Sequence, residues 1–212
     1  MSMDTKTFIE TCDFISMDTS SLMETKSLLN FLANYKPTIL QSGRTIFIYK
    51  EVIAELLSLR QGPKQAKANQ AENALQILAN NVDLFRLECP HEQSNVNLHN
   101  KIADQRFIGA VTWYKTQHTQ LFISNDKALL GSIVTAGELE AVQGNPVHAA
   151  NLSEDGQLIE FEYSRTDCQT VVEMNDRYAE GQFSGMLLGG FFSAVIVGGL
   201  SFLLHTQANR RF

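Results

Sequence analysis

The chain has 212 residues, 44% hydrophobic and 19% charged, which fits one domain of ordinary size with an appendage and excludes a disordered or repeat protein. Its formal net charge of −6, from 23 acidic and 17 basic residues, argues against a protein that coats nucleic acid, because neutralising phosphates requires lysine and arginine. The three cysteines, Cys12, Cys89 and Cys168, are odd in number and widely spaced, so neither a disulfide framework nor a zinc site is indicated, and a reducing compartment is the simpler interpretation.

Residues 1–140 alternate strand-like and helix-like segments, which predicts an α/β domain with a parallel sheet. In chain order, the predicted elements are a strand at 14–17, a helix at 22–35, a strand at 45–49, a helix ending at Gly62-Pro63, a helix at 66–80, a strand at 82–87, a helix at 97–115 and a strand at 121–123. We expect Pro37 to stop the first of these helices, because proline cannot donate the hydrogen bond that continues a helix.

Residues 141–182 differ in character from the segments before them. Val147–Leu152 and Leu158–Tyr163 flank the turn sequence Glu154-Asp155-Gly156, and this pattern predicts a β-hairpin. Residues 164–182 are polar and are expected to form a helix or a linker. We expect the hairpin region to pack on the sheet edge or to receive a partner, such as an inhibitor or regulatory protein.

The run from Phe183 to Leu204 contains no charged residue and predicts a transmembrane helix, because about 20 apolar residues span a bilayer. A buried core helix is the alternative. Gly185 and Gly189 have the small-xxx-small spacing that would let two copies pair as a homodimer in the membrane. Only the short tail 205–212 follows, so the sequence predicts a single-pass C-terminal anchor. Basic residues are balanced on its two sides and leave the orientation open; without an N-terminal signal peptide, we expect a cytoplasmic soluble domain.

Four acidic residues stand where an α/β sheet delivers its functional groups. Asp18 and Asp126 follow predicted strands, Glu55 lies one turn into a helix, and Asp104 lies near the start of another. Four carboxylates at one sheet edge would repel one another unless divalent cations neutralise them, and Mg²⁺ or Mn²⁺ suits such oxygen ligands. The alternatives are that Asp18 and Asp126 only cap helices, that Glu55 and Asp104 are surface residues, or that Glu51 replaces Glu55 in the site.

The segments FISMDTSSLM, VIAELL, IADQRFIGAV and LFISNDKALL occur in this order and resemble the four conserved blocks of PIN domains, over roughly residues 12–135. This resemblance implies a three-layer domain with a parallel sheet, whose edge holds one or two divalent metals for RNA hydrolysis. It implies that the catalytic, metal-binding acids are Asp18, Glu55, Asp104 and Asp126. The small polar residues that the family often has near its first and last aspartates would be Ser20 and Ser124.

The function predicted from these features is a membrane-anchored, metal-dependent endoribonuclease that hydrolyses RNA phosphodiester bonds. Lys127, next to Asp126, could contact a substrate phosphate, and an exposed helix residue is the alternative. A catalytically inactive PIN-like scaffold or binding module is the alternative function. A phosphatase of the haloacid dehalogenase type is disfavoured, because Asp18-Thr19-Ser20 lacks the second acid of its Asp-x-Asp pattern.

Overall fold

The computed structural model describes residues 3–88, 103–138 and 143–162, and for residues 103–106 the backbone alone. The expected membrane span at 183–204, the linker at 164–182 and the start of the helix expected at 97 lie outside these ranges. Within them, no helix combines the length and apolarity that crossing a bilayer requires.

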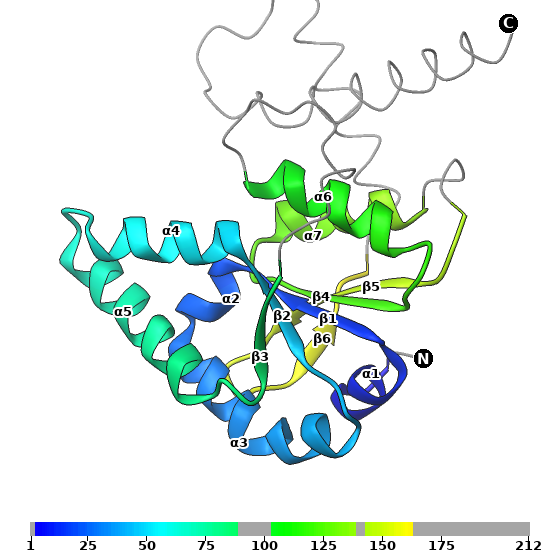
Figure 1. Ribbon diagram of the computed structural model, residues 1–212, viewed down its shortest axis with the longest axis horizontal. Helices are drawn as coiled ribbons and strands as arrows, with labels where there is room; N and C mark the ends of the chain where they lie inside the picture. Colours follow the sequence, from blue (N-terminus) through cyan, green and yellow to red (C-terminus); the bar gives the residue numbers. More distant parts are fainter. Residues whose placement is uncertain (1–2, 89–102, 139–142, 163–212) are drawn as a thin grey trace, which may run out of the picture. The chain divides into compact units, whose positions relative to one another are not determined.

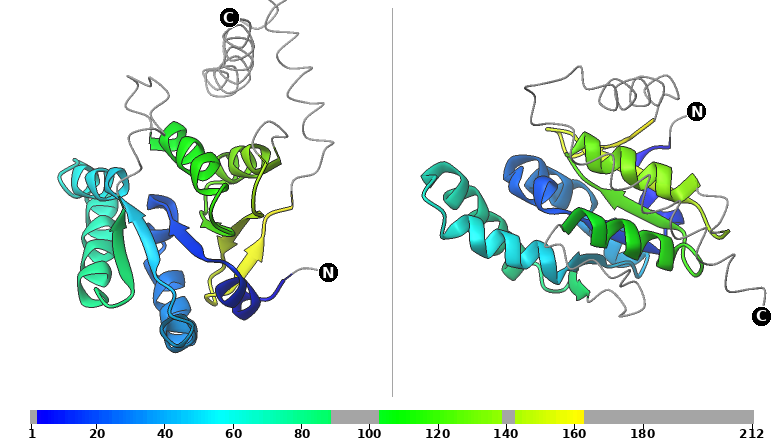
Figure 2. Two further views of the ribbon diagram at one scale, coloured as in Figure 1. Left: turned by 45° about the vertical axis from the view of Figure 1, so that its right-hand side comes forward. Right: turned by 90° about the horizontal axis from the view of Figure 1, so that it is seen from above.

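The described chain forms a six-stranded sheet with helices on both faces (Figures 1 and 2). The strands are β1 Phe14–Met17, β2 Ile46–Tyr49, β3 Phe85–Glu88, β4 Gln120–Ile123, β5 Val147–Leu152 and β6 Leu158–Glu160. The helices are α1 Thr5–Thr11, α2 Thr19–Met23, α3 Thr25–Gln41, α4 Lys50–Arg60, α5 Gln65–Asn80, α6 Ala103–Tyr114 and α7 Lys127–Glu138. This is the predicted α/β class.

The strand order is β3-β2-β1-β4-β5-β6, and every pairing is parallel except that of β5 with β6. The chain therefore builds the sheet outward from β1 in one direction, through β2 and β3, and then crosses to the other side of β1 to place β4. Such a reversal is a topological switch point, and ligands of open α/β sheets bind beyond the carboxyl ends of the strands at that point. Here the switch point lies between β1 and β4.

Alternating side chains on the strands direct two cores to opposite faces of the sheet. On one face, Phe107 of α6 packs against Tyr49 and Phe122, with ring centroids 5.3 and 5.5 Å apart. Figures 1 and 2 show α6 and α7 on this side of the sheet, and α2, α3 and α5 on the other. Ile15 and Met17, which alternate along β1, belong to the hydrophobic core, and all four residues of β1 are buried, as in a parallel sheet covered on both faces.

Several elements differ from the sequence predictions. Pro37 does not end its helix: α3 continues to Gln41, because Pro37 is exposed to solvent while Ile39 beyond it is fully buried, so packing outweighs the missing hydrogen bond. The strand predicted at 82–87 begins only at Phe85, since Val82 lies in a turn with 77% of its surface exposed. Helix α1 was not anticipated; Asp4 caps it by accepting a hydrogen bond from the Thr7 N–H.

The hairpin predicted from the turn sequence is present as β5 and β6, with β6 ending at Glu160. It continues the sheet, because β5 pairs with β4, and its turn is fixed on α3: Asn30 Nδ2 donates to the Glu154 carbonyl at 2.7 Å. Gly156 has a φ of +80°, and a Cβ there would lie 2.3 Å from the backbone nitrogen of Phe31. Only glycine lets the turn approach α3 this closely.

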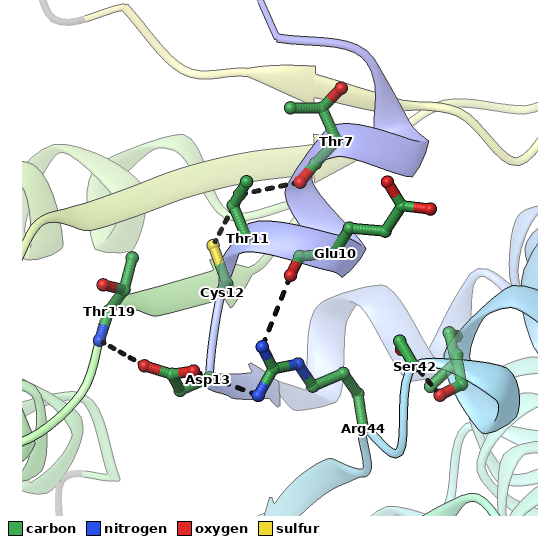
Figure 3. Close-up of polar contacts among 9 residues, drawn as sticks. Thr7, Glu10, Thr11, Cys12, Asp13, Ser42, Arg44 and Thr119 are labelled. Carbon is green, nitrogen blue, oxygen red and sulfur yellow. Dashed lines mark hydrogen bonds and ion pairs between the residues drawn. The ribbon is translucent and has the colours of Figure 1, made fainter.

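The amino ends of the strands are joined by a different set of polar contacts, shown in Figure 3. Asp13, just before β1, pairs with Arg44 at 3.0 Å and accepts from the Thr119 N–H before β4 at 3.4 Å. Arg44 also donates to the Glu10 carbonyl at 3.3 Å. Beside them, Cys12 is fully buried, and burial raises the pKa of its thiol to about 11. Asp13, the acid at this edge of the sheet, thus has a cationic partner in Arg44.

Candidate active site

The first two elements of the site are the strand ends on either side of the switch point. Met17 and Ile123 are register partners, so the chain leaves β1 and β4 side by side. The Asp18 N–H donates to the Ile123 carbonyl at 3.1 Å, which extends the ladder by one residue beyond β1. Asp18 and Ser124, the first residues after these two strands, therefore lie next to each other, although they are far apart in the sequence.

Asp18 is the buried acid of the site, with 4% of its surface exposed. It caps α2 by accepting from the Ser21 N–H at 3.1 Å, and its carboxylate also accepts from the hydroxyls of Ser20, at 2.9 and 3.0 Å, and Ser124, at 2.9 Å. Burial raises the pKa of the Asp18 carboxyl above its usual value, and the hydrogen bonds from Ser21, Ser124 and Ser20 oppose that shift. Asp18 is thus a cap and also the centre of a wider network.

Asp126 is connected to Asp18 through the two serines. Its N–H donates to Ser124 Oγ at 3.0 Å, while the Asn125 N–H donates to Ser20 Oγ at 2.8 Å. The Asp126 side chain is exposed, and its Oδ1 accepts from the N–H groups of Ala128 and Leu129 at the start of α7, at 2.8 and 3.1 Å. In the described contacts Asp126 Oδ2 accepts no hydrogen bond, so this oxygen is available to a ligand.

Glu55 joins the site from α4. Its Oε2 accepts a hydrogen bond from the Thr19 hydroxyl at 2.7 Å, and Thr19, which is buried, directly follows Asp18. Glu55 itself is exposed, one turn beyond the half-buried Glu51 that the sequence leaves as the alternative. The contact through Thr19 places Glu55 beside the end of β1.

The remaining predicted residues are placed less completely. Asp104 lies in the first turn of α6, and its side chain is outside what the structure describes. Lys127 is the first residue of α7 and is exposed next to Asp126. The structure therefore brings Asp18 together with Ser20 and Ser124, connects Asp126 to them through the main chain, and connects Glu55 through Thr19.

Sequence reasoning missed two residues of this network, Thr19 and Asn125. Thr19 holds Glu55, and Asn125 uses its side-chain amide to bind the main chain of Leu152 in β5, with Oδ1 accepting at 2.9 Å and Nδ2 donating at 3.2 Å. The available signal was their position: each is adjacent to a predicted acid at a strand end, where short polar side chains bind neighbouring backbone or side-chain groups.

The electrostatics of this edge contrast with those of the opposite one. No ion pair between described side chains includes Asp18, Glu55 or Asp126, whereas Asp13 at the amino edge is paired with Arg44. A buried carboxylate without a cationic neighbour is destabilised in its charged form, and a bound cation would remove that penalty.

The donors at this edge fit a hard divalent cation in type, because all of them are carboxylate or hydroxyl oxygens and none is sulfur or nitrogen. The described side chains do not by themselves complete such a site: no group of three or more histidines, cysteines, aspartates and glutamates among them is close enough to hold a metal ion. The acids that the structure shows are Asp18, Asp126 and Glu55, and the fourth predicted acid is on the described backbone of α6.

Comparison with known proteins gives a family and a structural likeness. A family model described as PIN domain matches residues 4–132. A solved structure titled as that of the PIN domain endonuclease Utp24 is similar with a TM-score of 0.45 and 18% sequence identity, over 70% of this chain and 92% of that chain. Among curated proteins, none matches this sequence.

Proposed function

Because the chain belongs to the PIN domain family, whose members are generally metal-dependent nucleases, we propose that it is a divalent-metal-dependent endoribonuclease. The observation that carries the proposal is the network at the switch point, where Ser20 and Ser124 both donate to buried Asp18 and also accept from the main chain around Asp126. The carboxyl ends of β1 and β4 thus carry a connected set of carboxylate and hydroxyl oxygens in the place where α/β sheets bind ligands.

Each residue of the set has a role in the proposed reaction, the hydrolysis of an RNA phosphodiester bond. Asp18, Asp126 and Asp104 would hold the cation, while Glu55, which accepts a hydrogen bond from Thr19, would bind the cation or hold a water molecule beside it. When bound, Mg²⁺ or Mn²⁺ would lower the pKa of a water molecule and would stabilise negative charge on the phosphate oxygens. Ser20 and Ser124 keep the Asp18 carboxylate in one orientation, and Lys127 is exposed where it can meet a phosphate.

The test uses the full chain in detergent, mixed single-stranded and structured RNAs, and either Mn²⁺, Mg²⁺ or EDTA. The Asp18→Asn, Asp126→Asn double variant removes the proposed ligands. Glu154→Gln is the matched control, because it makes the same carboxylate-to-amide change in an exposed ion pair with Lys26, where such pairs contribute little. We expect internal cleavage that needs metal, persists in the control and disappears in the double variant. Cleavage that survives EDTA or the double substitution contradicts the assignment.

One observation favours a second function, a non-catalytic binding module: the described acids do not form a complete metal-binding group. The same preparation separates the two functions. A chain that folds, shows no rise in melting temperature with Mn²⁺ and cleaves none of the RNAs would contradict the nuclease and favour the binding module, because a folded state that bound Mn²⁺ would be stabilised by it.

We also propose that residues 183–204 anchor the protein in a membrane, supported by the charge-free run from Phe183 to Leu204. Two arginines at Ala194 and Val197 would place charge in the middle of this run, at a cost of about 2.5–3.5 kcal/mol each. We expect the chain to float with lipid vesicles and the Ala194→Arg, Val197→Arg variant to stay in the soluble fraction. Gln207→Arg, outside the run, is the control. Equal flotation of all three chains would refute the anchor.

A further inference from the structure

The residue between Ser124 and Asp126 is held from two sides. The Asn125 N–H donates to Ser20 Oγ at 2.8 Å, and the Asn125 side chain makes both an accepting and a donating hydrogen bond to the main chain of Leu152. Leu152 is the last residue of β5 and is buried, with 3% of its surface exposed. Asn125 is therefore the link between the Asp18 network and the neighbouring strand.

The two hydrogen bonds from the Asn125 side chain to Leu152 take the place of the next backbone pairing between β4 and β5. Ile123 and Ala150 are register partners, and the Ser124 N–H donates to the Ala150 carbonyl at 3.0 Å, so the next step along β5 is Leu152. The backbone turns away there to begin α7. The side-chain amide of Asn125 offers an N–H donor beside a carbonyl acceptor, as the peptide backbone does, and satisfies Leu152 in place of the backbone.

The strand end to which Asn125 is attached is itself fixed. Beyond Leu152, the hairpin turn is bound to α3 through Asn30, and Gly156 packs directly on the backbone of that helix. The Leu158 N–H on the return strand donates to the Thr5 hydroxyl at 2.8 Å, which attaches the hairpin to α1 as well. Asn125 thus connects the turn between β4 and α7 to a strand end that contacts with α1 and α3 hold in place.

We propose that Asn125 is a positioning residue of the nuclease site, which holds the Ser124–Asp126 turn so that Ser124 keeps its hydrogen bond to Asp18 and the Asp126 carboxylate stays beside Asp18, where a cation would bind. This inference rests on the proposed function. Asn125 contacts neither the substrate nor the metal; it acts through Asp126 and Ser124. The chemistry explains the residue type, since alanine offers neither hydrogen bond and serine is too short to make both.

The test compares Asn125→Ala with Asn30→Ala in the full chain. The control, Asn30→Ala, also removes an asparagine that binds the hairpin main chain, here at the Glu154 carbonyl, but it leaves the 124–126 turn unchanged. Mn²⁺ affinity is measured from the electron paramagnetic resonance signal of the free ion, kcat and KM on a single-stranded oligoribonucleotide, and melting temperature in EDTA. We expect Asn125→Ala to weaken Mn²⁺ binding about 10-fold or more and to lower kcat with little change in KM for RNA.

For Asn30→Ala, we expect a lower melting temperature with parental Mn²⁺ affinity. Asn125→Ser is the second variant if the alanine chain does not fold, with the same expected loss of affinity. Suppose that the parent binds Mn²⁺ and cleaves RNA. The positioning role is then overturned if the Asn125 variants bind Mn²⁺ as tightly as the parent, or if Asn30→Ala loses as much Mn²⁺ affinity as they do. A parent that does neither overturns the proposed function and this inference with it.

Discussion

Replacing Asp18 by asparagine tests the buried acid directly, because it removes the charge and nearly preserves the shape. Asparagine is as good an N-cap as aspartate, so the bond from the Ser21 N–H is kept. Its amide nitrogen would take the place of Oδ2 and face the hydroxyls of both Ser20 and Ser124, which can rotate to accept, at the cost of about one hydrogen bond, or ~1 kcal/mol. Removal of a buried charge offsets this loss. In EDTA we expect a stability change within about 1 kcal/mol, or about 2–4 °C in melting temperature.

Mn²⁺ separates the parent from this variant. At a concentration 100 times the dissociation constant, a ligand that binds only the folded state adds about 2.7 kcal/mol, which corresponds to a rise of ~5–10 °C for a chain of this size. We expect this rise in the parent and a much smaller one in Asp18→Asn. Asp18→Ala is the contrasting variant: it loses the cap and leaves buried donors unpaired, so it should lose about 2–4 kcal/mol without any metal.

The assay is thermal unfolding of the full chain in detergent, followed by circular dichroism, with EDTA and with increasing Mn²⁺. Two results would refute the reasoning. If Asp18→Asn rises in melting temperature with Mn²⁺ as much as the parent, Asp18 is not a ligand. If Asp18→Asn is as unstable in EDTA as Asp18→Ala, the carboxylate charge is needed for folding and its burial is compensated by something other than a cation.

Three further predictions follow from the geometry. Thr19→Val removes the hydroxyl that holds Glu55 and should weaken Mn²⁺ binding about 10-fold in a titration, whereas Thr19→Ser should not; equal affinities would exclude this role. Gly156→Ala should lower the urea-measured free energy of unfolding by more than about 2 kcal/mol, against ~1 kcal/mol for Gly43→Ala, which has φ +67° but open space around it; similar losses would show that the turn can move off α3. The pKa of Asp18 is raised above 3.8 in the folded, metal-free chain, so between pH 3.8 and that raised pKa the folded chain keeps a proton that the unfolded chain has released. The free energy of unfolding, measured relative to Asp18→Asn, should therefore fall as the pH rises through this window. A difference that does not depend on pH would contradict the raised pKa.

The sequence predicted the class of fold and the strand ends that bear the acids because these depend on local patterns. Short apolar strands followed at once by polar residues, as at Phe14–Met17 before Asp18 and Gln120–Ile123 before Ser124, mark the carboxyl edge of a parallel sheet. Which strands become neighbours is not a local property. The adjacency of β1 and β4, which creates the switch point, came only from the structure.

The residues that sequence reasoning missed depend on long-range contacts. Thr19 and Asn125 look like ordinary turn residues until α4 and β5 are placed beside them. Pro37 shows the reverse case, in which a strong local signal for helix termination is outweighed by the burial of Ile39. Whether Asp104 joins the other acids stays a prediction, since its side chain lies beyond what the structure describes.

The thiol of Cys12 gives the protein a native reporter of domain opening. It is fully buried beneath the amino edge of the sheet, and with a pKa of about 11 it stays protonated near neutral pH, while alkylating reagents react with the thiolate. Iodoacetamide can therefore modify Cys12 only in molecules that have transiently opened around β1. The rate at which the Cys12 peptide gains mass, followed by mass spectrometry, would measure the opening equilibrium of the strand that precedes Asp18 without any engineered label.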